Sequence, residues 1–170
     1  MIVEFEPNLN IIKLDSAMAS LHCHHYNCGL LKTLEEIKEI DAHKIFIQAA
    51  NEEFYINFKN YISRYLKDKT AREKLDAAAV LYRSMGFGII DTSSLNESGG
   101  RAYSDSSYYV VGWLAKYGRR ETPVCYLTCG FLSGILSAIY DKPSNTYRVE
   151  EKKCMITGNE HCEFVVSVNK

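Results

Sequence analysis

The chain has 170 residues, and its 20 Lys and Arg residues nearly balance its 21 Asp and Glu residues, so its formal net charge is −1. With 46% hydrophobic and 24% charged residues and only 3 Pro, the composition is that of a globular protein, which argues against a disordered chain and against sequence-independent nucleic-acid binding. No apolar run is long enough to cross a bilayer, and the acidic first residues do not resemble a secretory signal. We therefore expect one cytoplasmic domain with no membrane span and no nucleic-acid partner.

The first half of the chain is expected to be helical. Asp15 could cap a helix that starts near Ser16, and Gly29 could divide this helix in two. Apolar residues recur at helical spacing between residues 42 and 66, without Gly or Pro. Thr70 followed by Glu73 is a capping box, which predicts a third helix that ends near residue 86.

The second half is expected to form a sheet. Residues 87–92 and 103–114 are typical of strands, and residues 147–156 and 161–168 predict a hairpin about the turn 157–160. Residues 123–140 predict one inserted helix, whose small residues on one side favour close packing against a neighbour: Gly130, Ser133, Gly134 and Ser137. The fold class is therefore α+β, with N-terminal helices followed by an antiparallel sheet with one inserted helix.

The six cysteines indicate chemistry, because a reducing compartment favours metal ligation or thiol chemistry over a disulfide framework. Cys154 and Cys162 lie symmetrically about Gly158, so hairpin pairing would put their Cα atoms about 4.5 to 5.5 Å apart. A shared metal, a Cys154–Cys162 disulfide and plain buried thiols all fit this spacing. Joint ligation by Glu151 and Cys154 would require a β-bulge between them, because in a regular strand they point to opposite faces.

The segment from Cys125 to Gly134, the Glu151-Lys-Lys-Cys154 motif and the hairpin His161-Cys162-Glu-Phe164 resemble the C-terminal half of the 4-vinyl reductase domain family. The resemblance runs from residue 123 to residue 166. It implies a fold similar to trafficking-complex subunits and to the haem nitric-oxide-binding domain. It also implies a single domain over 1–170, in which 1–85 is a helical, dimerising part and 86–170 holds the sheet, the pocket and a zinc site.

Carried onto this chain, the family's zinc ligands are Cys125, Glu151, Cys154 and Cys162, and the extra thiol of Cys129 could replace Cys125. A zinc ion with four protein ligands is expected to be structural. The resemblance also implies a small hydrophobic or aromatic ligand near the zinc, and aromatic side chains suit such a pocket. The expected ligand-binding residues are Tyr103, Tyr108, Trp113, Phe131 and Tyr147.

The expected function is that of a zinc-stabilised, homodimeric sensor or carrier of a hydrophobic molecule, without enzymatic activity. Two alternatives are an enzyme or accessory in tetrapyrrole vinyl reduction and a trafficking-type scaffold. The chain contains no GxSxG, P-loop, GxGxxG or HExxH motif, so no catalytic residue is predicted. A second cluster could be a metal or haem site or a polar interface helix: His22, His24, His25 and Cys28.

Overall fold

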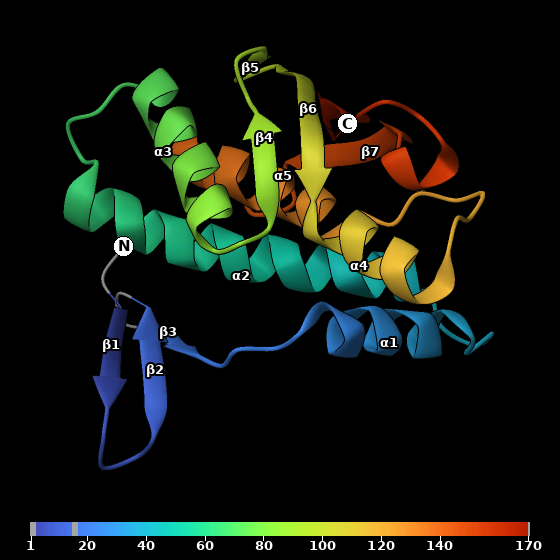
Figure 1. Cartoon of the computed structure of the whole chain (residues 1–170). Helices are drawn as coiled ribbons and strands as arrows, with labels where there is room; N and C mark the ends of the chain where they lie inside the picture. The colour runs from blue at the N-terminus through green and yellow to red at the C-terminus, as the bar shows by residue number, and fades with distance from the viewer. Residues whose placement is uncertain (1–2, 15–16, 170) are drawn as a thin grey trace.

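The computed structural model describes residues 3–14 and 17–169, and it contains two antiparallel sheets and five α-helices within these ranges (Figure 1). The helices are α1 (His24–Glu35), α2 (Ala42–Tyr65), α3 (Ala71–Ser84), α4 (Tyr108–Tyr117) and α5 (Tyr126–Ile139), with a short 3-10 helix η1 (Met155–Thr157). The strands are β1 (Val3–Glu6), β2 (Ile11–Leu14), β3 (Ala17–Ala19), β4 (Gly88–Asp91), β5 (Leu95–Asn96), β6 (Gly99–Ser107), β7 (Tyr147–Lys153) and β8 (Cys162–Val168).

The main sheet has the order β4-β6-β8-β7, with β5 paired to β6, and all of its pairings are antiparallel. In Figure 1, α2 lies across the molecule, with α3 above it and α5 behind the sheet. The α+β class is confirmed, but two helices, α4 and α5, are inserted between β6 and β7 where the sequence predicts one.

Two helices begin where their capping residues predict. The Asp41 side chain accepts a hydrogen bond from the Lys44 amide at the start of α2. Thr70 and Glu73 form the predicted capping box, in which each side chain accepts from the other residue's backbone N–H. Both helices are confirmed to within one or two residues of the expected bounds.

Close packing holds α5 against α2. A Cβ added to Gly130 would lie 2.5 Å from the Ala50 Cβ atom, and one added to Gly134 would lie 2.6 Å from the Asn51 carbonyl oxygen. The stripe of small residues therefore lets the two backbones approach, as the sequence predicts.

Two parts of the expected secondary structure are wrong. Residues 108–114 continue as helix α4 because Ser107 ends the strand and its hydroxyl accepts from the Val110 amide, which caps the helix. The N-terminal part is not all helical, since β1, β2 and β3 form a separate small sheet. Asp15 and Ser16 lie outside the described residues, while the first helix begins only at His24 and runs through Gly29 unbroken.

No described helix combines the length and apolar character that spanning a bilayer would require.

Candidate functional site

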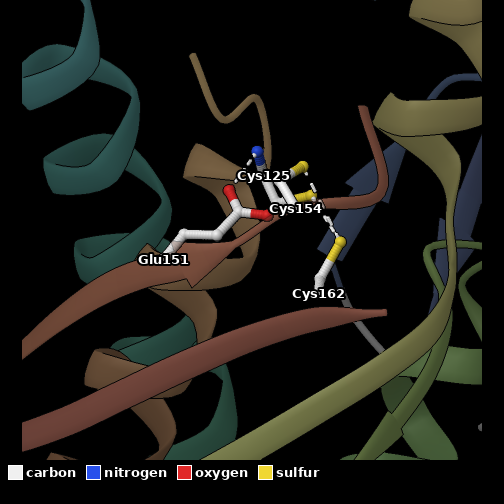
Figure 2. A group of neighbouring side chains, drawn as sticks. All are labelled: Cys125, Glu151, Cys154 and Cys162. Atoms are coloured by element: carbon white, nitrogen blue, oxygen red, sulfur yellow. Dashed lines mark hydrogen bonds between the residues drawn. The ribbon is translucent and has the colours of Figure 1, made fainter. Parts of the chain in front are cut away.

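Four side chains from separate parts of the chain meet behind the main sheet. Cys125 precedes the first residue of α5, Glu151 lies in β7, Cys154 precedes η1, and Cys162 begins β8. One ligand atom from each residue lies within 4.8 Å of all the others, as Figure 2 shows. The three cysteines are completely buried. We call these four residues the thiol–carboxyl group.

The β7–β8 hairpin forms this group by a local irregularity. Glu151 is opposite Phe164 and Lys153 is opposite Glu163, so Lys152 is an extra residue in β7. This bulge lets Glu151 and Cys154 reach the same point, although they would face opposite ways in a regular strand. Gly158 then turns the chain with φ of +99°, a conformation that favours glycine. The predicted hairpin and its bulge are both confirmed.

The sulfur atoms lie too far apart for a disulfide. The Cys162 Sγ is 3.8 Å from the Cys154 Sγ and 3.9 Å from the Cys125 Sγ, whereas an S–S bond is about 2.05 Å long. The backbone amide of Met155 also approaches the Cys162 Sγ, at 3.5 Å. The structure therefore does not contain the disulfide that the sequence left open.

The metal-free group favours a single negative charge. Hydrogen bonds from the Cys125 and Cys154 thiols lower the pKa of Cys162 to about 5, whereas hydrogen bonding with Cys154 and with Cys162 raises the pKa of Cys125. Burial raises the pKa of Glu151 to about 8, and the neighbouring Cys154 adds to this shift. At neutral pH one thiolate is thus surrounded by two thiols and a protonated carboxyl.

The residues present fit a metal ion. The Glu151 Oε2 atom accepts a hydrogen bond from the Cys125 amide at 2.9 Å, but its buried Oε1 atom has no partner. An unpaired buried oxygen is costly, and a cation would satisfy it. Three thiols and one carboxyl supply four anionic donors when deprotonated, which is a complete set for a tetrahedral, thiophilic ion.

Cys129 is not one of the four. It lies one helical turn after Cys125, is buried, and its pKa is raised by burial. The geometry therefore favours Cys125 over Cys129 as the first ligand, a choice that the sequence alone did not settle.

The five expected ligand-binding aromatics do not line one pocket. Tyr147 lines an open cleft, and Tyr103 lines a separate hollow beside His161. The Trp113 ring lies under the Arg120 guanidinium, 4.4 Å from it, and beside Tyr117. Phe131 is buried and Tyr108 is partly buried, and both join one set of interior rings.

These rings form a connected cluster between α2, α3, α4 and α5. Phe131 lies 4.8 Å from Tyr82 and 5.0 Å from Phe54 between ring centroids, and Phe87 contacts both of these rings and Tyr108. We call these five residues the ring cluster. Phe54, Tyr82 and Phe87 are not among the residues expected from the sequence, although Tyr82 shares a helical face with Leu75 and Ala78.

The ring cluster adjoins the thiol–carboxyl group. The Tyr82 hydroxyl hydrogen-bonds to the Thr128 hydroxyl at 2.7 Å, and Thr128 lies in the first turn of α5 after Cys125. Burial raises the pKa of Tyr82, and the nearby Cys125 and Cys162 sulfurs add to the shift. The hydroxyl is therefore a neutral polar group at the junction of the two sites.

The His22–Cys28 segment does not assemble a metal site among the residues that the structure describes, where the thiol–carboxyl group alone has suitable geometry. The His24 and His25 rings contact each other, and Cys28 is buried against Gly112 of α4. This segment packs α1 onto α4.

The comparisons with known proteins agree with this architecture. A curated relative, an uncharacterised protein of Methanocaldococcus jannaschii, is 47% identical over 49 residues, which are 28% of this chain and 20% of the relative. The matched part therefore spans about one fifth of that relative's length.

Solved structures share the fold over most of the chain. The phenol-responsive sensory domain of the transcription activator PoxR, solved with phenol, matches 98% of this chain and 84% of its own, with a TM-score of 0.80 and 17% identity. A vinyl-4-reductase family protein from Methanocaldococcus jannaschii matches 89% of this chain and 84% of its own, with a TM-score of 0.59 and 17% identity.

A trafficking protein particle complex subunit 3 from Naegleria fowleri, covalently bound to palmitic acid, matches 86% of this chain and 95% of its own, with a TM-score of 0.53 and 12% identity. An H-NOX protein from S. oneidensis covers 91% of this chain and 81% of its own, with a TM-score of 0.56 and 10% identity. The expected likeness to both folds is confirmed. The family model of the 4-vinyl reductase domain matches residues 113–168, which include the whole thiol–carboxyl group, and this match identifies the chain as a 4-vinyl reductase domain protein.

Proposed function

We propose that this protein is a zinc-stabilised domain that binds a small aromatic or hydrophobic molecule and acts as a sensor or carrier, by binding and not by catalysis. The observation that carries the proposal is the buried ring cluster beside the thiol–carboxyl group. Its fold likeness to a phenol-responsive sensory domain supports an aromatic ligand. Aromatic walls with one polar group suit a phenol-like molecule, whose hydroxyl would pair near Tyr82 and Thr128.

A phenol titration tests this proposal. Phenol is expected to bind saturably and to be recovered unchanged, and Tyr82→Phe is expected to weaken binding about tenfold because it removes the polar group of the ring cluster. Calorimetry measures both affinities. Tyr65→Phe is the matched control, since Tyr65 is exposed at the end of α2. Equal phenol affinity in Tyr82→Phe and the unmodified protein would place the ligand elsewhere.

Zinc is proposed as the metal because it accepts thiolate and carboxylate ligands in one tetrahedral set. Residues Cys125, Glu151, Cys154 and Cys162 would hold it, and a bound zinc ion would supply a structural crosslink between α5, β7 and β8. With four protein ligands no position is left open for catalysis.

Zinc binding at pH 7 is expected to release about three protons. The pKa of Glu151 is about 8 and the pKa of Cys125 is raised, so these two groups and the Cys154 thiol are protonated in the metal-free protein, whereas Cys162, with a pKa of about 5, is already ionised. Calorimetric titration of zinc in buffers with different ionisation enthalpies counts the protons. A count near zero would mean that the group is already fully ionised, contrary to this charge state.

We also propose that the protein is a homodimer that pairs through its N-terminal part. Apolar side chains of the small sheet and the segment after it are largely exposed: Val3, Phe5, Leu9, Met18 and Leu21. Burying them against a second chain would remove this surface from water. Native mass spectrometry is expected to show two chains and two zinc ions per particle, and a particle with one chain at micromolar concentration would contradict the dimer.

A further inference from the structure

An open cleft of about 1100 Å³ runs between α2, the first half of α5 and β7. It is separate from the ring cluster, because none of the five ring-cluster residues lines it. Six residues that form its floor and walls are Ile47, Asn51, Tyr126, Ser133, Tyr147 and Val149.

The cleft contains buried acceptors that the protein does not satisfy. Among the described residues, two buried side-chain atoms have no hydrogen-bond partner, Asn51 Oδ1 and Glu151 Oε1, and both residues line this cleft. A metal ion in the thiol–carboxyl group would satisfy Glu151, but Asn51 has no such explanation.

The orientation of the Asn51 amide is fixed by its own donors. The Nδ2 group donates to the Ser133 hydroxyl at 2.6 Å and to the Ser144 carbonyl at 2.8 Å. The Ser133 hydroxyl in turn donates to the Tyr147 carbonyl at 2.6 Å. These bonds leave Oδ1 as an acceptor, on a side chain that is only 2% exposed. A ligand that brings a hydrogen-bond donor would therefore find a pre-oriented partner.

The remaining surface of the cleft favours a neutral molecule with a compact apolar body. Ile47 and Val149 supply aliphatic walls, and the stacked rings of His43 and Tyr126, 4.3 Å apart, lie at one end. At the rim, Arg148 and Lys152 both form ion pairs with Glu150, so their charges are largely compensated.

We propose that this cleft is a second small-molecule site, which binds a neutral alcohol or amide whose O–H or N–H group donates to Asn51 Oδ1. The site is independent of the aromatic ligand proposed above. Its wall strand β7 also carries Glu151, so an occupant would contact the same strand that contributes to the thiol–carboxyl group.

The test compares two probes that differ in one donor, cyclohexanol and cyclohexanone, by chemical-shift titration of the isotope-labelled, zinc-loaded protein. Cyclohexanol is expected to bind about tenfold more tightly, because the ketone cannot donate to Asn51 Oδ1. The shifts are expected at Ile47 and Val149. Ile47→Trp, which fills the cleft, is expected to abolish binding, whereas Ile45→Trp, on the exposed side of the same helix, is expected to preserve it.

Equal affinity for the two probes would overturn the proposal, as would shifts confined to the ring cluster or unchanged cyclohexanol binding in Ile47→Trp. A phenol titration of the same samples separates the two sites. Phenol shifts at Phe131 without cyclohexanol shifts at Ile47 would refute only the cleft, and the reverse result would refute only the aromatic site.

Discussion

Replacing Cys162 by serine is expected to remove the zinc and a large part of the stability together. The Cys162 Sγ lies between the sulfurs of Cys125 and Cys154, and it is the thiol most readily ionised in the metal-free group. Structural zinc contributes folding free energy directly, because the unfolded chain does not hold the site. A metal present at a thousandfold excess over its Kd stabilises the fold by about 4 kcal/mol, which corresponds to a melting temperature about 8 to 16 °C higher.

Elemental analysis and thermal unfolding measure the two effects. Cys129→Ser is the informative comparison, because Cys129 is a buried thiol one turn from Cys125 but lies outside the thiol–carboxyl group. It is expected to keep one zinc per chain, and Cys23→Ser, at an exposed position, is expected to change nothing. A Cys162→Ser protein that has lost zinc but melts at the original temperature would refute a structural role for the metal.

The metal group could be predicted because its geometry is local. Cys154 and Cys162 are equidistant from Gly158, so the hairpin turn alone brings them together, and the need for a bulge at residues 152–153 follows from strand alternation. The helices α2 and α3 were likewise predictable from their caps and periodicity. In each case the determining residues lie within a few positions of one another.

The parts that sequence could not supply depend on contacts between distant elements. The ring cluster joins α2, α3, α4 and α5, and no periodicity within one segment reveals that Phe54 meets Phe131. Residues 108–114 are rich in Tyr, Val and Trp, which favour strands, yet the Ser107 cap and the burial of Tyr109, Val110 and Trp113 on one helical face prevail. The expected pocket therefore combined residues of a strand that ends at Ser107 with residues of a helix.

Gly130→Ala is expected to lower the free energy of unfolding by about 2 kcal/mol or more. Alanine has the better helix propensity by about 1 kcal/mol, so an exposed helix would be stabilised by this change. Here the new Cβ would lie 2.5 Å from the Ala50 Cβ and 2.9 Å from the Asn51 amide nitrogen, and the Ile47 carbonyl oxygen is also in contact. These are backbone and Cβ atoms that cannot rotate away, so α2 and α5 would have to separate, and overpacking of this kind typically costs about 1 to 3 kcal/mol.

Gly29→Ala provides the matched control, because Gly29 is also inside a helix but its nearest neighbour is the flexible end of Lys116 at 3.1 Å. It is expected to leave stability unchanged or to raise it by up to about 1 kcal/mol. Urea unfolding of both variants measures the difference. If Gly130→Ala were as stable as Gly29→Ala, the α2–α5 contact would be looser than the structure shows. Because α5 carries Phe131 and follows directly on Cys125, a loosened contact would also displace the walls of both proposed ligand sites, and phenol and cyclohexanol binding should weaken together in Gly130→Ala.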